Sequence, residues 1–289
     1  MSGEISPSDT FYKSDEEIIL SLEKVGMCFS GKQNVHALSD FSLNVHKGEF
    51  ICILGPSGCG KSTLLSIIAG IYPATEGSVQ IEGKPIAGMD WHRAIMFQTS
   101  TLYPWLSVYD NIAFGPKVRK VPKKQIDDSV RKYIELVGLK DFTYAKPYEL
   151  SGGMKQRASL ARVLVNEPSV ILMDEPLCSL DAFTRSLMQV FIRDIWRKIK
   201  MTTLLITHDI DEALSLGSRV IVLSKRPGRI IGMFNAMFSR SLMGTPEDDE
   251  LRASGEYVSM RRKIYDLIDT STDTGVSNTS ACEAQSAVA

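Results

Sequence analysis

The chain of 289 residues has no apolar run long enough to cross a membrane. Its apolar stretches, such as 170–173 and 220–223, are far shorter than the ~20 residues that a transmembrane helix needs. The first fifteen residues also lack a basic stretch followed by an apolar core, so they do not resemble a secretory leader. We therefore expect a protein that is neither secreted nor embedded in a bilayer.

The chain also lacks an excess of charge of either sign and lacks cysteines at the spacing of a metal site. The 33 basic and 34 acidic residues leave a net charge of −1, so the whole chain has no electrostatic attraction for nucleic acid, and no such partner is expected. The five cysteines have neither Cys-x-x-Cys nor histidine spacing, which indicates reduced cytosolic thiols and excludes disulfide staples and metal clusters. Any anion that this protein binds must therefore be held by a local site.

The order of strand and helix patterns predicts an α/β protein. Residues 1–17 are polar and residues 270–289 contain no aromatic side chain, so both ends are predicted to be disordered tails. Strands are predicted at 18–22, 38–45, 50–54, 78–81, 94–97, 170–173, 203–207 and 220–223. Helices are predicted at 62–69, 181–199, 210–216 and 257–268, with a largely helical insert over about 99–164. Alternating strands and helices predict a parallel sheet covered by helices.

One apolar stripe in the predicted helix 181–199 is interpreted as core. Its members recur every four residues and are Phe183, Leu187, Phe191, Ile195 and Ile199.

A glycine-rich loop between a predicted strand and a predicted helix indicates nucleoside triphosphate binding. Its residues are Gly55, Pro56, Ser57, Gly58, Cys59, Gly60, Lys61, Ser62 and Thr63. The glycines allow backbone amides to close on phosphate oxygens, and the start of the helix adds positive potential. Lys61 supplies a charge for the β- and γ-phosphates, and the Ser62 hydroxyl is a ligand for Mg²⁺.

Two adjacent acids follow a second buried strand. Asp174 and Glu175 come directly after the apolar run 170–173, at the sheet edge where ligands of open α/β sheets bind. Asp174 suits a Mg²⁺ ligand, and Glu175 can polarise an attacking water. Such a pair can also be merely solvated, but the glycine-rich loop earlier in the chain favours the functional interpretation.

A second anion site is available at Ser151, Gly152 and Gly153, which precede the helical run 154–162 and present backbone amides at its start. Serine is a common helix cap and glycine a common turn former, so this run alone does not decide between structure and function.

The ordered motifs resemble the ATP-binding cassette of ABC transporters over about residues 18–235. They are 55–63, Gln98, 150–157, 170–176, 179–181 and 207–209. The resemblance implies a P-loop NTPase fold: a RecA-like core, an N-terminal antiparallel β-subdomain and an inserted α-helical subdomain. Residues 236–269 would then form a short C-terminal helical extension.

The resemblance also implies roles for single residues. Phe29 would stack on adenine, and Gln98 would sense the γ-phosphate and bind Mg²⁺. His208 would contact the γ-phosphate, so Lys61, Gln98, Glu175 and His208 form the expected catalytic set.

A head-to-tail dimer with an identical or related cassette is implied too. In it, Ser151, Gly152 and Gly153 of one subunit would close on the ATP held by Lys61 of the other, and Asp181 would cross the boundary.

Two positions depart from the family pattern. The family more often has tyrosine at the position of Phe29, whose ring could instead fill the β-layer. Cys178 and Ser179 stand where relatives commonly have Gly-Ala or Ser-Ala, which affects the expected dimer contact but not the phosphate chemistry.

Large apolar groups at 101–115 suggest a docking surface, although a packed loop would have the same composition. In the family this region receives a permease. The runs 104–106 and 224–230 resemble importers of nitrate, taurine and aliphatic sulfonates. We therefore expect an ATPase at the cytoplasmic face of the membrane, with a separate permease and, indirectly, a solute-binding protein.

Two other functions fit the sequence less well. A soluble ABC ATPase acting on a macromolecule would be expected to have tandem cassettes or long coiled coils, and this chain has one cassette without sustained heptads. An inactive cassette is disfavoured by the presence of Lys61, Glu175 and His208. The transported solute does not follow from the sequence.

Overall fold

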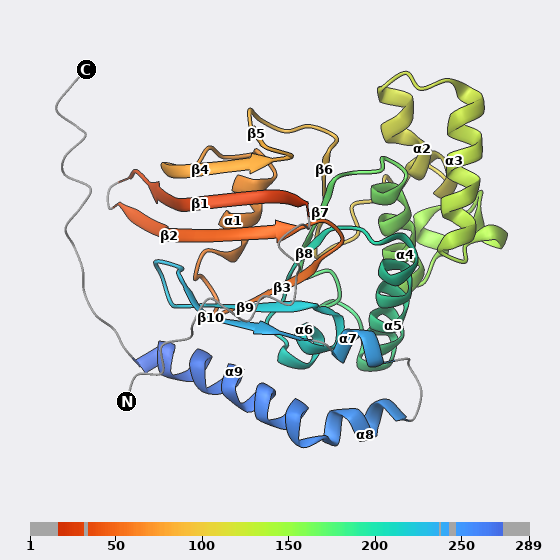
Figure 1. Cartoon of the computed structure of the whole chain (residues 1–289). Helices are drawn as coiled ribbons and strands as arrows, with labels where there is room; N and C mark the ends of the chain where they lie inside the picture. The colour runs from red at the N-terminus through yellow and green to blue at the C-terminus, as the bar shows by residue number, and fades with distance from the viewer. Residues whose placement is uncertain (1–16, 32–33, 237, 243–246, 274–289) are drawn as a thin grey trace, which may run out of the picture.

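The computed structural model describes residues 17–31, 34–236, 238–242 and 247–273. The predicted N-terminal tail, apart from residue 17, and residues 274–289 of the predicted C-terminal tail lie outside the described residues. Figure 1 shows two sheets, a group of helices beside them and a long helix beneath.

The first sheet is antiparallel and confirms the expected N-terminal β-subdomain. Its strand order is β2-β1-β4-β5, built from β1 (Ile18–Phe29), β2 (Val35–His46), β4 (Glu76–Ile81) and β5 (Lys84–Pro85). Along the second half of β2, buried apolar residues alternate with exposed polar residues, as expected for a strand with one face on the core. Strands β1 and β2 are longer than their predicted runs.

The second sheet is the parallel sheet that the sequence predicts, with one antiparallel edge. Its order is β10-β9-β3-β8-β7-β6, built from β3 (Phe50–Leu54), β6 (Arg93–Met96), β7 (Val170–Asp174), β8 (Thr203–Ile206), β9 (Arg219–Leu223) and β10 (Ile230–Asn235). The edge strand β10 pairs antiparallel with β9 and was not predicted. Gly232 interrupts its apolar run, and the register shifts between Ile230 and Gly232.

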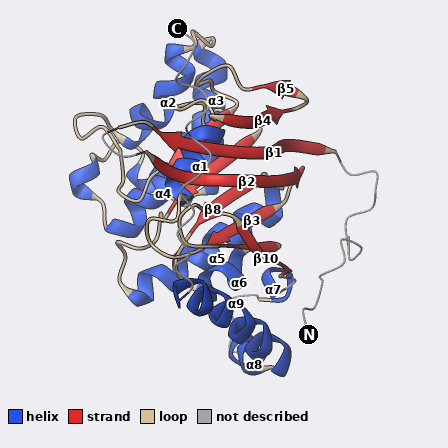
Figure 2. Ribbon diagram, turned by 90° about the vertical axis from the view of Figure 1, so that its left-hand side faces the viewer, coloured by secondary structure: helices blue, strands red, loops and turns tan. Residues whose placement is uncertain are grey.

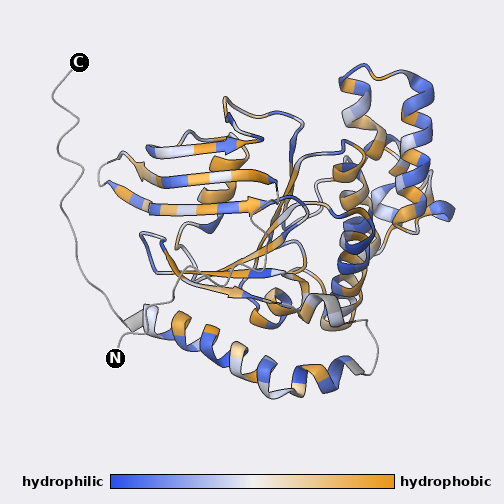
Figure 3. Cartoon of the chain, in the orientation of Figure 1, coloured by the Kyte–Doolittle hydropathy of each residue, from blue (hydrophilic) through white to orange (hydrophobic). Residues whose placement is uncertain are grey.

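Two hydrophobic cores cover the two faces of the parallel sheet. In β3, Phe50, Cys52 and Leu54 point into one core, whereas Ile51 and Ile53 point into the other. The second core joins this sheet to α1 (Lys61–Ile68) and to the antiparallel sheet, which forms a separate layer in Figure 2. Burial on both faces explains why these strands are continuously apolar and largely orange in Figure 3.

The first core continues into the helical insert. Helices α2 (Val108–Val118), α3 (Lys123–Leu136) and α4 (Gly152–Leu164) pack on one another, with short turns η1 (Lys140–Phe142) and η2 (Pro147–Glu149) between α3 and α4. Helix α4 lies next to the parallel sheet, and α2 and α3 lie farther out (Figure 1). Much of α3 is polar in Figure 3, and its apolar face is buried through Ile126, Val130, Tyr133 and Ile134.

The C-terminal segment contains more helix than predicted. Helices α7 (Phe238–Ser241) and α8 (Glu247–Ala253) precede α9 (Gly255–Asp273), which lies along α6 (Ile210–Leu216), β9 and β10. The Tyr257 hydroxyl donates to the Asp211 carboxylate at 3.2 Å and so ties α9 to α6. Helix α9 also extends four residues into the segment 270–289, which was predicted to be a disordered tail.

The predicted core stripe of α5 (Ala182–Ile199) is wrong at both ends. Phe183 and Leu187 are 75% and 55% exposed, and Ile199 is 38% exposed. A step of four residues turns a helix by about 40° beyond a full turn, so a stripe with this spacing winds from one face to another. The buried positions are Met188, Gln189, Ile192, Arg193, Ile195 and Trp196.

No helix within the described ranges combines the length and apolarity needed to traverse a bilayer.

Leu204 in β8 is fully buried and Leu187 on α5 is exposed, and this difference leads to a stability prediction. Leu204→Ala empties a fully buried position in β8 and should lower the free energy of unfolding by about 2–5 kcal/mol. Leu187→Ala removes the same atoms from an exposed position on α5 and should change it by no more than about 0.5 kcal/mol. Urea unfolding measures both variants, and equal losses would contradict the described packing of α5.

Candidate nucleotide site

The glycine-rich loop connects the end of β3 to the start of α1, as predicted. Gly60 has a φ of 106°, and a Cβ atom there would lie 2.5 Å from the carbonyl oxygen of Ala37. Gly58 has a left-handed φ of 75°. Only glycine fits the Gly60 position without strain, because both the backbone conformation and the approach of β2 exclude a side chain.

Lys61 is held inside this loop. Its ammonium group donates to the carbonyl oxygens of Gly55 at 2.7 Å and Pro56 at 2.9 Å, and the residue is 7% exposed. Neighbouring Cys59 is also buried, and this burial raises the pKa of its thiol. The loop therefore surrounds one buried ammonium group, which two carbonyl oxygens stabilise, and one buried thiol.

A cavity of about 400 Å³ lies against the loop and brings three predicted parts together. Phe29 at the end of β1 lines one side, the loop from Ser57 to Thr63 lines another, and Glu175 completes it. The Phe29 ring packs edge-to-face on Tyr72 with 5.9 Å between centroids, which orients it. Arg226 also lines the cavity, although sequence reasoning did not assign it to the site.

Two side-chain oxygen donors, those of Ser62 and Asp174, come together beside this cavity. The Ser62 hydroxyl donates to Oδ1 of Asp174 at 3.4 Å. Burial, helped by the nearby charge of Glu175, raises the pKa of Asp174, while the Ser62 hydrogen bond and Lys61 oppose the shift. Mg²⁺ prefers a few protein oxygens together with phosphates and waters, so this pair fits a nucleotide-bound Mg²⁺. Within the described ranges, no cluster of three or more acidic, histidine or cysteine side chains forms an all-protein metal site.

Glu175 and His208 come together, as expected. Their Oε2 and Nδ1 atoms are 3.1 Å apart, and Glu175 is much less exposed than His208. Glu175 has a left-handed φ of 44°, and its backbone amide donates to the carbonyl oxygen of Ile206 at 3.0 Å. A non-glycine residue in this conformation costs about 1–2 kcal/mol, so the bond to β8 holds a strained turn that directs the carboxylate to the sheet edge.

Gln98 lies just after β6, beside the loop that follows β7. Burial raises the pKa of the nearby Cys178 thiol and the Gln98 side chain opposes this shift, so the unusual Cys178 lies beside a predicted site residue. The buried Gln156 amide of α4 donates to the carbonyl oxygens of Gln98 at 3.3 Å and Pro176 at 2.8 Å. Helix α4 therefore ties together the two loops that carry Gln98 and Glu175.

Ser151, Gly152 and Gly153 begin α4, and they are not among the described residues that line the cavity at Lys61. The Ser151 hydroxyl caps the helix by accepting from the Met154 amide at 3.3 Å. A Cβ atom on Gly153 would lie 3.0 Å from Cγ2 of Thr184, so α4 packs closely on the start of α5.

The start of α5 is capped by Asp181, whose carboxylate accepts from the Thr184 amide at 2.9 Å. This bond lowers the pKa of Asp181. Ser151, Gly153 and Asp181 thus form a second cluster, separate from the cavity.

The segment before α2 carries exposed aromatic side chains on a rigid frame. The Tyr103 ring lies 5.5 Å from Trp105 and 4.8 Å from Phe114 between centroids, and Trp105 is 69% exposed. The fully buried Asn111 amide donates to the carbonyl oxygens of Tyr103, Leu106 and Ser107 at 3.0–3.2 Å.

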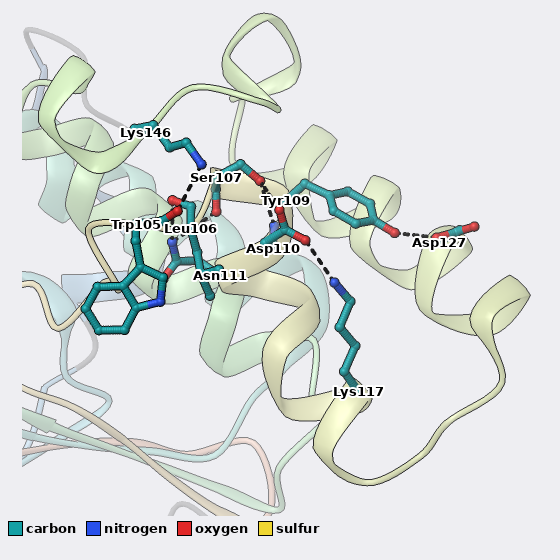
Figure 4. A network of polar contacts seen from close by, with 9 residues as sticks. All are labelled: Trp105, Leu106, Ser107, Tyr109, Asp110, Asn111, Lys117, Asp127 and Lys146. Carbon is teal, nitrogen blue, oxygen red and sulfur yellow. Dashed lines mark hydrogen bonds and ion pairs between the residues drawn. The ribbon is translucent and has the colours of Figure 1, made fainter.

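Figure 4 shows the further polar contacts that hold this segment in place. The carbonyl oxygen of Trp105 accepts from Lys146 at 2.9 Å, and Asp110 accepts from Ser107 and Lys117 at 2.8 Å each. The Trp105 ring lies outside this polar network (Figure 4). The surface formed by Tyr103, Trp105 and Phe114, named here the aromatic surface, is therefore exposed yet rigidly supported.

A phosphate-cradling loop, an acid pair at the same sheet edge and a helical insert define an ATP-binding cassette ATPase. The chain belongs to the ABC transporter family: residues 38–178 match that family, and relatives over 40% identical match most of the chain. The taurine import ATP-binding protein TauB of Roseobacter denitrificans is 44% identical over 252 residues, which cover 86% of this chain and 93% of the relative. An uncharacterized ABC transporter ATP-binding protein of Methanocaldococcus jannaschii is 42% identical, over 87% of this chain and 92% of the relative.

Solved structures agree with this assignment. The chain resembles cbiO1 of Clostridium perfringens, part of the ABC transporter complex cbiONQ, with a TM-score of 0.71 and 27% identity over 86% of this chain and 100% of that one. It also resembles the ATP-binding cassette MJ0796, solved as a dimer in a post-hydrolysis state with ADP and Pi. The TM-score is 0.64 and the identity 30%, over 75% of this chain and 99% of that one.

Proposed function

We propose that this chain is the ATP-hydrolysing subunit of an ABC importer that drives uptake of a small solute of the taurine, sulfonate or nitrate type through a separate permease. The observation that carries the hydrolytic part is the Glu175–His208 contact beside the cavity that Lys61 and Phe29 line. The import part is supported by the relative TauB and by the aromatic surface. Residues 18–235 form the ATPase domain in this proposal, with a helical insert at 99–164 and an extension at 236–269.

ATP enters the cavity with its base against Phe29 and its phosphates on the loop. Gly55 to Thr63 supply backbone amides, and the Lys61 ammonium group moves from the carbonyl oxygens of Gly55 and Pro56 to the β- and γ-phosphates. When bound, Mg²⁺ neutralises charge on these phosphates, and Ser62, Asp174 and Gln98 are the residues that hold it.

Glu175 acts as the general base. Its carboxylate accepts a proton from a water molecule whose oxygen attacks the γ-phosphorus, and the bond to the leaving ADP oxygen breaks to give ADP and phosphate. His208, 3.1 Å from Glu175, orients this carboxylate and donates a hydrogen bond to the γ-phosphate. Gln98 completes the catalytic set.

A second cassette completes each site. Ser151, Gly152 and Gly153 do not line the cavity of their own chain, yet they present backbone amides at the start of α4. In the head-to-tail dimer they close on the ATP held by the other subunit, and Asp181 crosses the boundary beside them.

The aromatic surface binds the permease. Aromatic side chains on a rigid frame lose little conformational entropy on docking, which suits the centre of an interface. The chain would thereby be a peripheral protein at the cytoplasmic face of the membrane, and a solute-binding protein would act only through the permease. No observation favours the rival function, a soluble ABC ATPase acting on a macromolecule.

The first test of this function removes the proposed base. Glu175→Gln keeps the shape of the side chain but cannot accept the proton, so ATP hydrolysis should fall at least about 100-fold while ATP binding persists and dimers accumulate. Phosphate release and analytical ultracentrifugation with ATP measure both effects. Glu23→Gln, at an exposed position on β1, is the control. Wild-type turnover in Glu175→Gln would rule out this base.

The second test addresses the permease. Trp105→Ala should weaken binding to the permease by about 30-fold, the effect of losing one aromatic hot spot of about 2 kcal/mol. ATP hydrolysis by the isolated cassette should remain unchanged, because Trp105 lies outside the nucleotide cavity. Trp91→Ala is the control, because Trp91 is 46% exposed and stacks on His92 instead. Equal permease binding by both variants would count against the aromatic surface.

A further inference from the structure

The loop between β9 and β10 is rigid and closed on itself. The Ser224 amide donates to the carbonyl oxygen of Arg229 at 2.9 Å, and the Ser224 hydroxyl accepts from the Arg229 amide at 3.0 Å. The same hydroxyl also lies 3.0 Å from the carbonyl oxygen of Pro227, to which it can donate. These bonds hold Arg226 at the tip of a fixed turn.

This turn is docked against the phosphate-binding loop. A Cβ atom on Gly228 would lie 2.2 Å from the carbonyl oxygen of Cys59, so only glycine allows the approach. The Gly228 amide donates to the carbonyl oxygen of Ala37 at 2.9 Å, and its own carbonyl oxygen accepts from the Ser39 amide at 3.2 Å. The turn therefore has a defined position relative to both the phosphate-binding loop and β2.

From this turn the Arg226 side chain reaches the centre of the phosphate-binding loop. Its Nε donates to the carbonyl oxygen of Gly58 at 3.0 Å, and its guanidinium lines the nucleotide cavity. Within the described part of the chain, this is the single hydrogen bond of a group that has five N–H donors. Because a trans peptide points its C=O and N–H in opposite directions, the bond also fixes the peptide between Gly58 and Cys59.

The two cations of the cavity differ in their surroundings. Lys61 is buried and compensated by two loop carbonyl oxygens, whereas Arg226 is exposed at the cavity wall. Glu175 is the single carboxylate among the described lining residues. A polyphosphate entering the cavity therefore meets the Arg226 guanidinium on the open side, where planar N–H donors suit phosphate oxygens.

We propose that Arg226 is a nucleotide-binding residue, which holds the Gly58 carbonyl with Nε and donates its remaining N–H groups to the phosphate chain of the bound nucleotide. This rests on the proposed function of the cavity as the ATP site. It adds a phosphate contact from the β9–β10 turn, a segment outside the motifs that define the site.

The test separates charge from structure. Arg226→Gln can still donate to the Gly58 carbonyl but has lost its charge, so the Kd for ATP should rise about tenfold, the effect of one charge-assisted hydrogen bond. Arg226→Lys keeps the charge but not the planar donor set, so it should recover part of the affinity. Arg229→Gln is the matched control, because Arg229 lies in the same turn and donates to the Ser39 hydroxyl at 3.2 Å, away from the cavity.

Binding of ATP is measured by calorimetry at two salt concentrations, with thermal unfolding of the free protein as a check on folding. We expect a weaker salt dependence for Arg226→Gln than for Arg229→Gln, because one phosphate contact is lost, and unchanged unfolding for both. Equal ATP affinity of Arg226→Gln and Arg229→Gln would overturn the inference, and so would equal salt dependence of ATP binding in these two variants.

Lys61→Ala distinguishes this inference from the assignment of the cavity itself. If Lys61→Ala abolishes ATP binding and Arg226→Gln leaves it unchanged, the role of Arg226 is wrong and the site stands. If Lys61→Ala also binds ATP normally, the cavity is not the ATP site and both proposals are wrong.

Discussion

The register of three parallel strands determines where the phosphate-binding loop, the acid pair and His208 lie relative to one another. Strand β8 pairs with β3 on one side, with Ile53 opposite Ile206, and with β7 on the other, with Asp174 opposite Ile206. The phosphate-binding loop, the acid pair and His208 follow the ends of these strands, so they emerge at one edge of the sheet. A shift of one residue in the pairing of β7 with β8 would turn the Asp174 side chain to the opposite face of the sheet and separate it from the loop.

Helix α4 connects this edge to the rest of the chain. Its Gln156 holds the loops that carry Gln98 and Pro176, and its first residues belong to the cluster that does not line the chain's own cavity. The same insert presents the aromatic surface, which combines the segment before α2 with Phe114 of α2. Closure of a second cassette on ATP and binding of the permease would therefore act on one helical unit, which is joined to the catalytic loops by a buried amide.

Site features that contiguous residues form could be predicted from the sequence. Features that form only when segments far apart in the sequence come together in the fold could not. The loop 55–63 and the pair Asp174–Glu175 are local patterns, each next to an apolar strand, and the structure brings them together. Arg226 lines the same cavity because Gly228 allows the β9–β10 turn to approach Cys59. No local sequence pattern indicates this approach. The exposed Phe183 and Leu187 show the converse error: a four-residue spacing resembles a core stripe although it drifts around the helix.

In the proposed dimer each ATP is enclosed by two chains, one providing Lys61 and the other Ser151. A mixture of Lys61→Ala and Ser151→Arg chains tests this shared site. In the mixed dimer, one site contains both substitutions. The other site combines the unchanged phosphate-binding loop of the Ser151→Arg chain with the unchanged Ser151 cluster of the Lys61→Ala chain. ATP-dependent association, measured by energy transfer between labelled chains, should occur in the mixture and be absent from each variant alone. Association of either variant alone, or none in the mixture, would contradict the account.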